Sequence, residues 1–315
     1  MRYTSHIPLA PSHMVPKKDG QYRHIQDLRK RNLDTDTMTW PLPDQEELVH
    51  AIAGSTNTSF FDLISAFDQT RIDPKDEQYA TIINRMGILQ QKVIQQDNNN
   101  AVATQQQRMQ HTLRKHWGKN VIVYIDDGTI FDDESGMSPY QHYRVCQDIL
   151  LTLRAAKFYL SRKKTQFFVD MVNEGMDVPG RHIQNGGISV AKSKIDAFVA
   201  LRSPTSFQEL GKDLDTFTWL TDHLPFTAKL SAPLHTLLHS GHWEWTETHE
   251  NAFRVLKEVV GGPEVLYPLN LKDGAPPIRE VSDASLVGGG GWIYQGKTIE
   301  TAKPAVYHSR VFNPA

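Results

Sequence analysis

The stretch that decides the fold reads Val121-Ile122-Val123-Tyr124-Ile125-Asp126-Asp127-Gly128. Its five β-branched or aromatic residues in succession predict a strand that is buried on both faces. Gly128 is expected to supply the backbone freedom for a tight turn after this strand. Two adjacent carboxylates repel each other and raise each other's pKa unless a cation lies between them. Because a hard divalent cation such as Mg²⁺ prefers oxygen ligands, the stretch predicts a metal site and, with it, phosphate chemistry.

A third acid, Asp62, follows the apolar pair Phe60-Phe61 and is expected at the end of another strand. A single Asp at a strand end is more often a turn or cap residue, so Asp62 alone is weak evidence for a site. Metal-dependent phosphoryl transfer, however, uses two or three acids to hold two cations about 4 Å apart. The combination of Asp62 with Asp126 and Asp127 therefore predicts a two-metal site.

The composition limits the class of protein. The chain has 315 residues, 39% of them hydrophobic, and a formal net charge of −2. This length predicts two or three subdomains, and the charge argues against a protein that coats nucleic acid without excluding a basic groove. No run of about 18 apolar residues predicts a membrane span, and no secretory leader is recognisable. Cys146 is the only cysteine, which excludes a disulfide framework and favours a reducing intracellular compartment.

The patterning predicts both helices and strands. The Gln- and Asn-rich segment 90–107 lies between well-patterned regions, so we expect it to be ordered and to run into a helix through Trp117. Thr205 and Gln208 have the spacing of a capping box, and Thr246 is expected to begin another helix. Four glycines at 288–291 are expected to separate strand-like pieces. The other predicted elements are a hairpin over 13–25, a helix over 46–53, a strand over 58–64 and a helix over 140–158.

Several segments match motifs of one polymerase family. Tyr124-Ile125-Asp126-Asp127 fits a Tyr-x-Asp-Asp box, and 61–67 (FDLISAF) is similar to the strand that carries a first metal-binding Asp. On these segments the chain resembles the reverse transcriptases of gypsy-class LTR retrotransposons, and their fungal branch most closely. The resemblance covers nearly the whole chain. Its further segments are 15–23, 27–32, 161–164, 232–234, 245–247, 252–253 and 282–285.

The resemblance implies a right-hand polymerase of the α+β class, with an antiparallel palm sheet backed by helices. Fingers and palm would span residues 1–165, the thumb and connection 166–270, and an incomplete RNase H-like segment 271–315. Asp283 would be the first RNase H carboxylate. Because an RNase H site needs three or four carboxylates, self-contained RNase H activity is not expected.

The resemblance also implies roles for residues around an active site. Asp62, Asp126 and Asp127 would be the catalytic carboxylates that bind two Mg²⁺ ions, or Mn²⁺ in their place. Phe67 would lie under the incoming sugar, where a flat ring excludes a 2′-hydroxyl. The remaining nucleotide-binding residues would be Lys17 and Arg23, which neutralise the triphosphate, and Gln96, which closes over the nucleotide.

The implied activity is RNA-directed DNA polymerisation, and the implied partners are a template-primer duplex and a dNTP, with no membrane. The sequence leaves open a homodimer or a parent polyprotein, and the expected location is the cytoplasm, the nucleus or a virus-like particle. One departure stands beside the site: Asp97 follows Gln96, where the family has Gly. It favours an alternative, a decayed or domesticated module that binds nucleic acid without catalysis. A different two-metal nucleotidyltransferase is a weaker alternative, because it leaves the thumb and connection matches unexplained.

Overall fold

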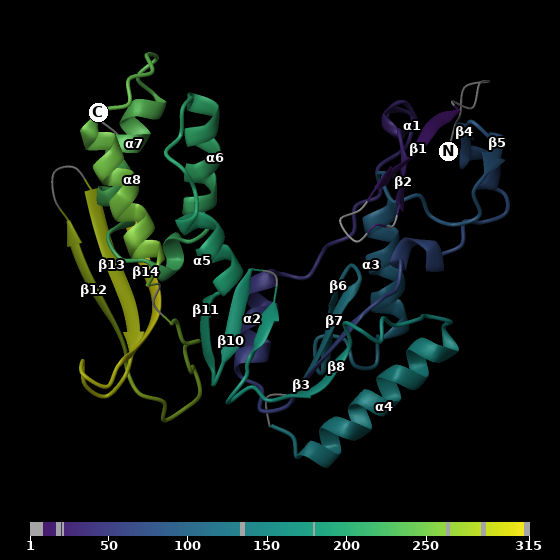
Figure 1. The fold of residues 1–315 in the computed structure, drawn as a ribbon. Coiled ribbons are helices and arrows are strands. Elements are labelled where there is room, and N and C mark those ends of the chain that lie inside the picture. Colours follow the sequence, from purple (N-terminus) through teal and green to yellow (C-terminus); the bar gives the residue numbers. More distant parts are fainter. Residues whose placement is uncertain are drawn as a thin grey trace. The chain divides into compact units, whose positions relative to one another are not determined.

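The structure, a computed structural model, describes residues 9–16, 20, 22–132, 136–178, 180–262, 265–284 and 288–311. The chain divides into two compact units (Figure 1): unit 1 consists of Met1–Leu48 and Ser55–Val169, and unit 2 of Val49–Gly54 and Asp170–Ala315. Helices and mostly antiparallel sheets occur together in the chain, which confirms the predicted α+β class.

The elements up to Val169 begin with two hairpin strands and end with an edge strand. They are β1 (Ala10–Pro16), β2 (Tyr22–Gln26), α1 (Arg29–Leu33), α2 (Gln45–Ala53), β3 (Thr58–Asp62), the short 3₁₀ helices η1 (Ala66–Gln69) and η2 (Glu77–Tyr79), β4 (Thr81–Asn84), β5 (Gly87–Gln90), α3 (Ala101–Thr112), β6 (Val121–Tyr124), β7 (Asp127–Phe131), α4 (Pro139–Ala155) and β8 (Gln166–Val169).

One antiparallel sheet of unit 1 has the strand order β6-β7-β3-β8, and α3 and α4 lie beside it (Figure 1). Alternate side chains of its strands point toward these helices and form a buried core with them. An antiparallel sheet backed by helices is the arrangement that the sequence predicts for this part of the chain. The core consists of Phe61, Leu63, Ala66, Met109, Leu113, Val121, Val123, Ile130, Cys146, Ile149, Leu153 and Phe158.

The β6–β7 turn differs from its prediction. The strand ends at Tyr124, and Ile125 lies in the turn with φ of +63°. A β-branched residue rarely adopts this left-handed conformation, which costs on the order of 1–3 kcal/mol and persists only where surrounding contacts impose it. Gly128, expected in the turn, lies within β7 between Val123 and Phe61. A Cβ atom on Gly128 would lie 2.1 Å from Phe61 Cζ, so this glycine is required by ring packing.

The second sheet of unit 1 has the order β2-β1-β4-β5, and its β1–β2 pair is the predicted hairpin. The Gln- and Asn-rich segment is ordered, as predicted, because its amide groups bond to residues 26–38. Gln95 Nε2 donates to Gln26 Oε1 at 2.6 Å, and Asn100 Oδ1 accepts from the Met38 amide at 2.7 Å. The helix that follows ends at Thr112, so Trp117 lies beyond it, contrary to the prediction.

Helix α4 confirms the predicted helix over 140–158, although it ends earlier, at Ala155. Ser138 and Gln141 form a capping box at its start, which satisfies two backbone amides that the helix leaves unpaired. Its buried side chains, His142, Cys146, Ile149 and Leu153, recur at helical spacing and face the sheet.

In unit 2 the predicted helices are confirmed, but the predicted helix cap at Thr205 and the predicted role of the four glycines are wrong. The cap of α6 (Phe207–Thr218) is Ser206, whose Oγ accepts from the Glu209 amide, and not Thr205. Gly288–Gly291 lie inside β13 (Gly288–Gln295) and do not separate strands. Thr246 caps α8 (Glu247–Val260) as predicted. The elements are β9 (Met176–Val178), β10 (Arg181–Gln184), β11 (Gly187–Val190), α5 (Lys192–Val199), α6 (Phe207–Thr218), η3 (Thr221–His223), α7 (Thr227–Leu238), α8 (Glu247–Val260), β12 (Ile278–Ala284), β13 (Gly288–Gln295) and β14 (Lys303–Val311).

Two sheets and a group of helices make up unit 2. The sheets have the orders β11-β10-β9 and β12-β13-β14, and both are antiparallel. The apolar faces of α5, α6, α7 and α8 meet in one core. This core contains Val190, Phe198, Leu210, Leu214, Phe217, Leu220, Leu224, Leu234, Leu237, Phe253, Leu256 and Val260.

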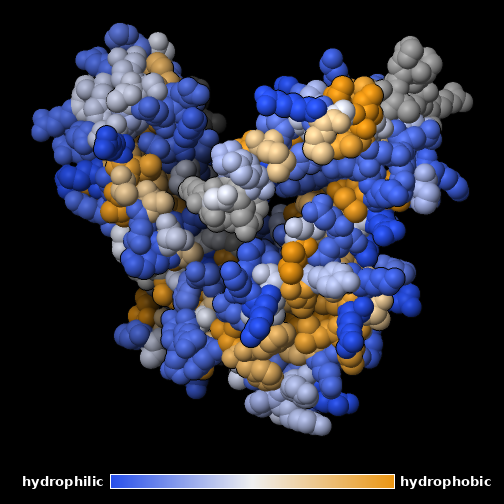
Figure 2. All heavy atoms as spheres, turned by 45° about the vertical axis from the view of Figure 1, so that its right-hand side comes forward, coloured by the Kyte–Doolittle hydropathy of each residue, from blue (hydrophilic) through white to orange (hydrophobic). Residues whose placement is uncertain are grey.

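The surface mixes charged and hydrophobic side chains. Figure 2 shows hydrophobic side chains in orange between hydrophilic ones in blue. The most exposed large apolar residues include Leu33 on α1 and Met86 between β4 and β5. Among the described residues, no helix is long and apolar enough to cross a membrane.

The packing of Gly128 against Phe61 gives a first prediction. Gly128→Ala forces the new methyl group into the Phe61 ring, so we expect the free energy of unfolding to fall by about 3 kcal/mol. Urea unfolding followed by circular dichroism measures the change. The matched control is Gly211→Ala in α6, where the added Cβ meets only Leu238 at 3.8 Å and should be neutral or slightly stabilising. A wild-type midpoint for Gly128→Ala would contradict this account.

Candidate metal centre

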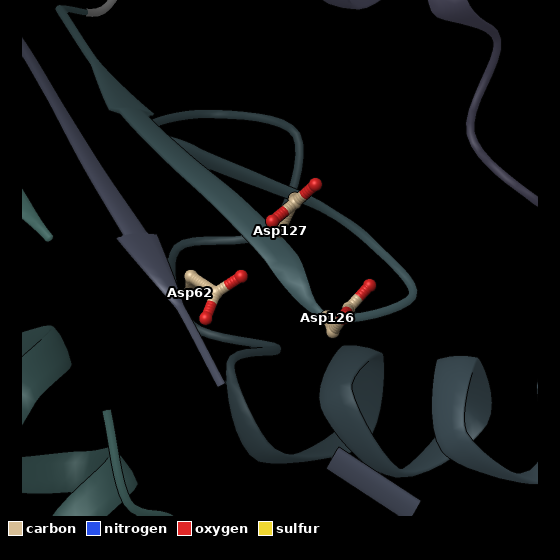
Figure 3. Close-up of side chains that lie close together, drawn as sticks. All are labelled: Asp62, Asp126 and Asp127. Atoms are coloured by element: carbon tan, nitrogen blue, oxygen red, sulfur yellow. The ribbon is translucent and has the colours of Figure 1, made fainter. Parts of the chain in front are cut away.

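Three carboxylates converge at one end of the β3–β7 pair (Figure 3). Asp62 is the last residue of β3 and lies opposite Asp127, the first residue of β7. Asp126 lies in the turn before β7, and its carbonyl accepts from the Leu63 amide at 3.0 Å. One oxygen atom from each carboxylate lies within 4.8 Å of the other two. The structure therefore brings together the three acids that the sequence predicts as metal ligands.

The carboxylates carry more negative charge than their surroundings neutralise. Burial, followed by the charges of Asp126 and Asp62, raises the pKa of Asp127 to about 6. Burial and the charge of Asp62 also raise the pKa of Asp126. Asp62 itself is buried, whereas the other two are half-buried and open to solvent on one side. A cation bound between the three groups would remove their mutual repulsion and oppose the effect of burial, and so lower these pKa values.

Lys164 is the one protein cation that the structure places in contact with this cluster, among the residues that it describes. Its Nζ lies 2.7 Å from Asp62 Oδ2, and the Asp62 contact raises the pKa of Lys164. The lysine reaches the site because the Ser161 amide donates to the Asp62 carbonyl at 2.8 Å. The sequence indicates a basic segment at 161–164 but gives no signal that Lys164 faces an acid 102 positions earlier.

Gln106 holds the strained turn that carries Asp126. It lies on α3 and is fully buried. Its Oε1 accepts from the Ile125 amide at 2.9 Å, and its Nε2 donates to the Val123 carbonyl at 2.7 Å. One side chain is thus bonded both to β6 and to the first residue of the turn, which explains how Ile125 is kept in a left-handed conformation. The sequence gives Gln106 only a place in the Gln- and Asn-rich segment that runs into a helix, because a buried amide has no distinctive pattern.

The donor set fits a hard divalent cation. The cluster offers only carboxylate oxygens, which are the ligands of Mg²⁺, Mn²⁺ and Ca²⁺, and neither His nor Cys contributes to it within the described part of the chain. Burial and the neighbouring carboxylates raise the pKa values of Asp126 and Asp127, and a dication bound there would favour the ionised form of both groups. Asp62, Asp126 and Asp127 are therefore the residues that could hold metal ions.

The other predicted site residues lie in different parts of the chain. Phe67 is half-buried in η1, Arg23 is exposed on β2, and Gln96 is exposed in the loop before α3. Their roles around a nucleotide stay predictions. Asp283 is exposed on β12 of unit 2, where its Oδ1 accepts from the Ala284 amide, and its RNase H role also stays a prediction. Lys17 lies outside the described residues.

Removing the Gln106 amide should loosen the turn that carries Asp126. Gln106→Met keeps the side-chain length but leaves the Ile125 amide and the Val123 carbonyl without their partner. We expect a loss of about 2 kcal/mol in the free energy of unfolding, together with weaker Mg²⁺ binding in calorimetric titration. The control is Gln107→Met, at a half-buried neighbour on the same helix. Equal free energies of unfolding and equal Mg²⁺ affinities in the two variants would contradict the role of Gln106.

Neutralising Asp127 should stabilise the metal-free protein at alkaline pH. Its folded-state pKa of about 6 lies above the ordinary 3.8, so ionisation destabilises the fold as pH rises through 6. We expect Asp127→Asn to raise the Tm in EDTA at pH 8 and the gain to disappear toward pH 4. The exposed Asp76→Asn is the control.

With Mg²⁺ at pH 8, we expect the wild-type protein to have a higher Tm than Asp127→Asn. Mg²⁺ should raise the Tm of the wild-type protein and of Asp76→Asn, because it binds the folded state. It should raise the Tm of Asp127→Asn much less, because one ligand is lost. An Asp127→Asn variant that is less stable than wild type in EDTA would show that the buried charge of Asp127 does not destabilise the metal-free fold.

The chain matches the model of one known protein family. The family model described as "Reverse transcriptase (RNA-dependent DNA polymerase)" matches residues 15–214. The Tf2-3 and Tf2-4 transposon polyproteins of Schizosaccharomyces pombe are each 27% identical over 316 residues, which is 100% of this chain. The chain spans 23% of the length of these curated relatives.

Solved structures show the same fold. A foamy viral protease-reverse transcriptase in complex with double-stranded DNA has a TM-score of 0.84 at 19% identity, and the match covers 98% of this chain and 62% of that one. The foamy viral enzyme in complex with an RNA/DNA hybrid has a TM-score of 0.78, and the match covers 97% of this chain and 40% of that one. These neighbours have the right-hand polymerase fold, which confirms the predicted fold class. With a family model that matches most of its length, this chain belongs to the reverse transcriptase (RNA-dependent DNA polymerase) family.

Proposed function

We propose that the chain is the RNA-directed DNA polymerase of a gypsy-class LTR retrotransposon. It would transfer a deoxynucleotidyl group from a dNTP to a primer 3′-hydroxyl on an RNA or DNA template. The observation that carries this proposal is the convergence of Asp62, Asp126 and Asp127 within a reverse transcriptase family member. The similarity to Tf2 polyproteins over the whole chain supports the retrotransposon origin.

The three carboxylates would hold two Mg²⁺ ions, with Mn²⁺ as a substitute. Bound there, such ions lower the pKa of the primer hydroxyl and neutralise charge on the phosphates. Asp62 is fixed by its position at the end of β3, and Asp126 by the Gln106 contacts to its turn. The chain thus supplies prearranged ligands, which is the main protein contribution to phosphoryl transfer.

In the proposed reaction the primer 3′-oxygen attacks the α-phosphorus of the dNTP. A new O–P bond forms as the bond to the leaving pyrophosphate breaks, and the hydroxyl proton passes to solvent. Phe67 would exclude a 2′-hydroxyl, and Gln96 would close over the nucleotide. Lys17 and Arg23 would neutralise the triphosphate and the pyrophosphate.

The proposed partner is a template-primer duplex, which a polymerase must grip without sequence preference. Such contacts go mainly to the backbone and to the shape of the duplex. The foamy viral neighbours, whose structures contain double-stranded DNA or an RNA/DNA hybrid, support this partner. We further propose fingers and palm at 1–165, thumb and connection at 166–270, and an RNase H-like segment at 271–315.

Primer extension on poly(rA)·oligo(dT) with Mg²⁺ tests the activity. We expect dTTP incorporation by the wild-type chain and a loss of at least about 100-fold in Asp126→Asn, because one metal ligand becomes a weaker neutral donor. Asp76→Asn, an exposed acid away from the cluster, should retain wild-type incorporation. Activity that survives in Asp126→Asn would contradict the proposed site.

A folded wild-type chain without incorporation would favour the non-catalytic alternative. Asp97 then becomes the first residue to change, because it is exposed beside Gln96, where the family has Gly. Negative charge at that position opposes a triphosphate. Asp97→Gly should restore incorporation if the acid causes the loss, and continued inactivity would leave a nucleic-acid-binding module as the better function.

A further inference from the structure

Arg108 on α3 holds oxygen atoms of two other elements. Its NH1 donates to the Gln69 carbonyl at 2.7 Å and to Thr70 Oγ1 at 2.6 Å, and its NH2 donates to the Ala156 carbonyl at 3.2 Å. The guanidinium also lies 4.1 Å from the centre of the Phe158 ring. These contacts use the planar fork of arginine, which a lysine ammonium cannot reproduce.

The carbonyls that Arg108 binds lie at the ends of helical elements. Gln69 is the last residue of η1, and Ala156 is the C-cap of α4. Carbonyls at such ends lack partners inside their own helix and carry partial negative charge, so a cation there is favourable. One side chain of α3 therefore fixes the ends of η1 and α4.

Thr70 extends this contact into the core. Its hydroxyl accepts from Arg108 and donates to Gln105 Oε1 at 2.9 Å. Thr70 is buried and Gln105 is fully buried. The Gln105 Nε2 atom has no hydrogen-bond partner among the described residues. Hydrogen bonds from Arg108 to Thr70 and from Thr70 to Gln105 thus join α3 to the residue that follows η1.

The same residue connects both predicted nucleotide-binding segments. The Thr70 amide donates to the Phe67 carbonyl at 3.1 Å, and the Thr70 carbonyl accepts from the Ile94 amide at 2.9 Å. Ile94 precedes Gln96 by two residues. A displacement of Thr70 would therefore move the η1 turn that carries Phe67.

We propose that Arg108 is a positioning residue that fixes Phe67 through Gln69 and Thr70 and thereby sets the discrimination between dNTPs and rNTPs. The inference rests on the proposed polymerase function. A ring that excludes a hydroxyl must be held within a fraction of an ångström, because rejection depends on contact distance. Among the residues that the structure describes, no hydrogen bond or ion pair joins the side chains of this network to the carboxylates of Asp62, Asp126 and Asp127, so metal binding should be independent of it.

The test compares Arg108→Lys with Arg114→Lys, a matched change at an exposed arginine just beyond α3. The ratio of kcat/KM for dTTP to that for UTP is measured on poly(rA)·oligo(dT). We expect a fall of about tenfold in Arg108→Lys, the size of one lost charge-assisted hydrogen bond, mainly through a lower KM for UTP. The ratio of Arg114→Lys should equal that of wild type. An unchanged ratio in Arg108→Lys would overturn the proposal.

A double-mutant cycle with Phe67→Ala tests whether Arg108 acts through Phe67. In the Phe67→Ala background, Arg108→Lys should have no further effect on the ratio. Additive effects of the two changes would overturn the proposed route.

Hydrogen exchange gives a readout that does not need activity. Amides of residues 66–70 should exchange faster in Arg108→Lys, while those of 121–124 should keep the wild-type rate. Unchanged exchange at 66–70 would show that Arg108 does not hold η1. If the wild-type chain incorporates neither nucleotide, the polymerase proposal fails and sugar selection fails with it. The exchange rates still decide whether Arg108 positions the turn.

Discussion

The gathering of Asp62, Asp126 and Asp127 at one half-buried end of the β3–β7 pair is the constraint that the contacts around it must satisfy. Burial, and then the charges of the neighbouring carboxylates, raises the pKa of Asp127 to about 6, so the ionised cluster destabilises a metal-free fold. The contacts of Lys164 with Asp62 and of Gln106 with the β6–β7 turn oppose this cost. Such an arrangement is stable as a ligand set for cations rather than as a structural cluster, which is why the site is best understood through metal binding.

Helix α3 connects the metal site to the predicted nucleotide site. Gln106 bonds to the turn before Asp127, whereas Gln105 and Arg108 bond to Thr70 after η1. Neighbouring residues of one helix therefore hold the turn that carries the candidate metal ligands and the turn that carries the proposed sugar-selecting ring. Buried polar side chains are costly unless they are hydrogen-bonded, so these contacts also fix the conformation of the loops that they reach.

Sequence patterns predicted the elements better than their ends. Runs of apolar residues located β3 and β6, helical spacing of apolar residues located α4, and Thr246 located the start of α8. The errors came from residue types that occur in more than one structural context. Gly128 was expected in a turn because glycine tolerates unusual dihedral angles, yet it serves close packing against Phe61. Ile125 was counted in the strand because β-branched residues favour strands, yet Gln106 holds it in the turn.

The sequence by itself determined the three acids, the α+β class and the family, because these depend on residue type and local spacing. Only the tertiary structure decided which distant side chains serve the site. Lys164 meets Asp62 through the pairing of chain segments, and Arg108 meets Gln69 and Ala156 through the packing of α3. Contacts between residues far apart in the chain follow from register and helix packing, which local patterns do not encode.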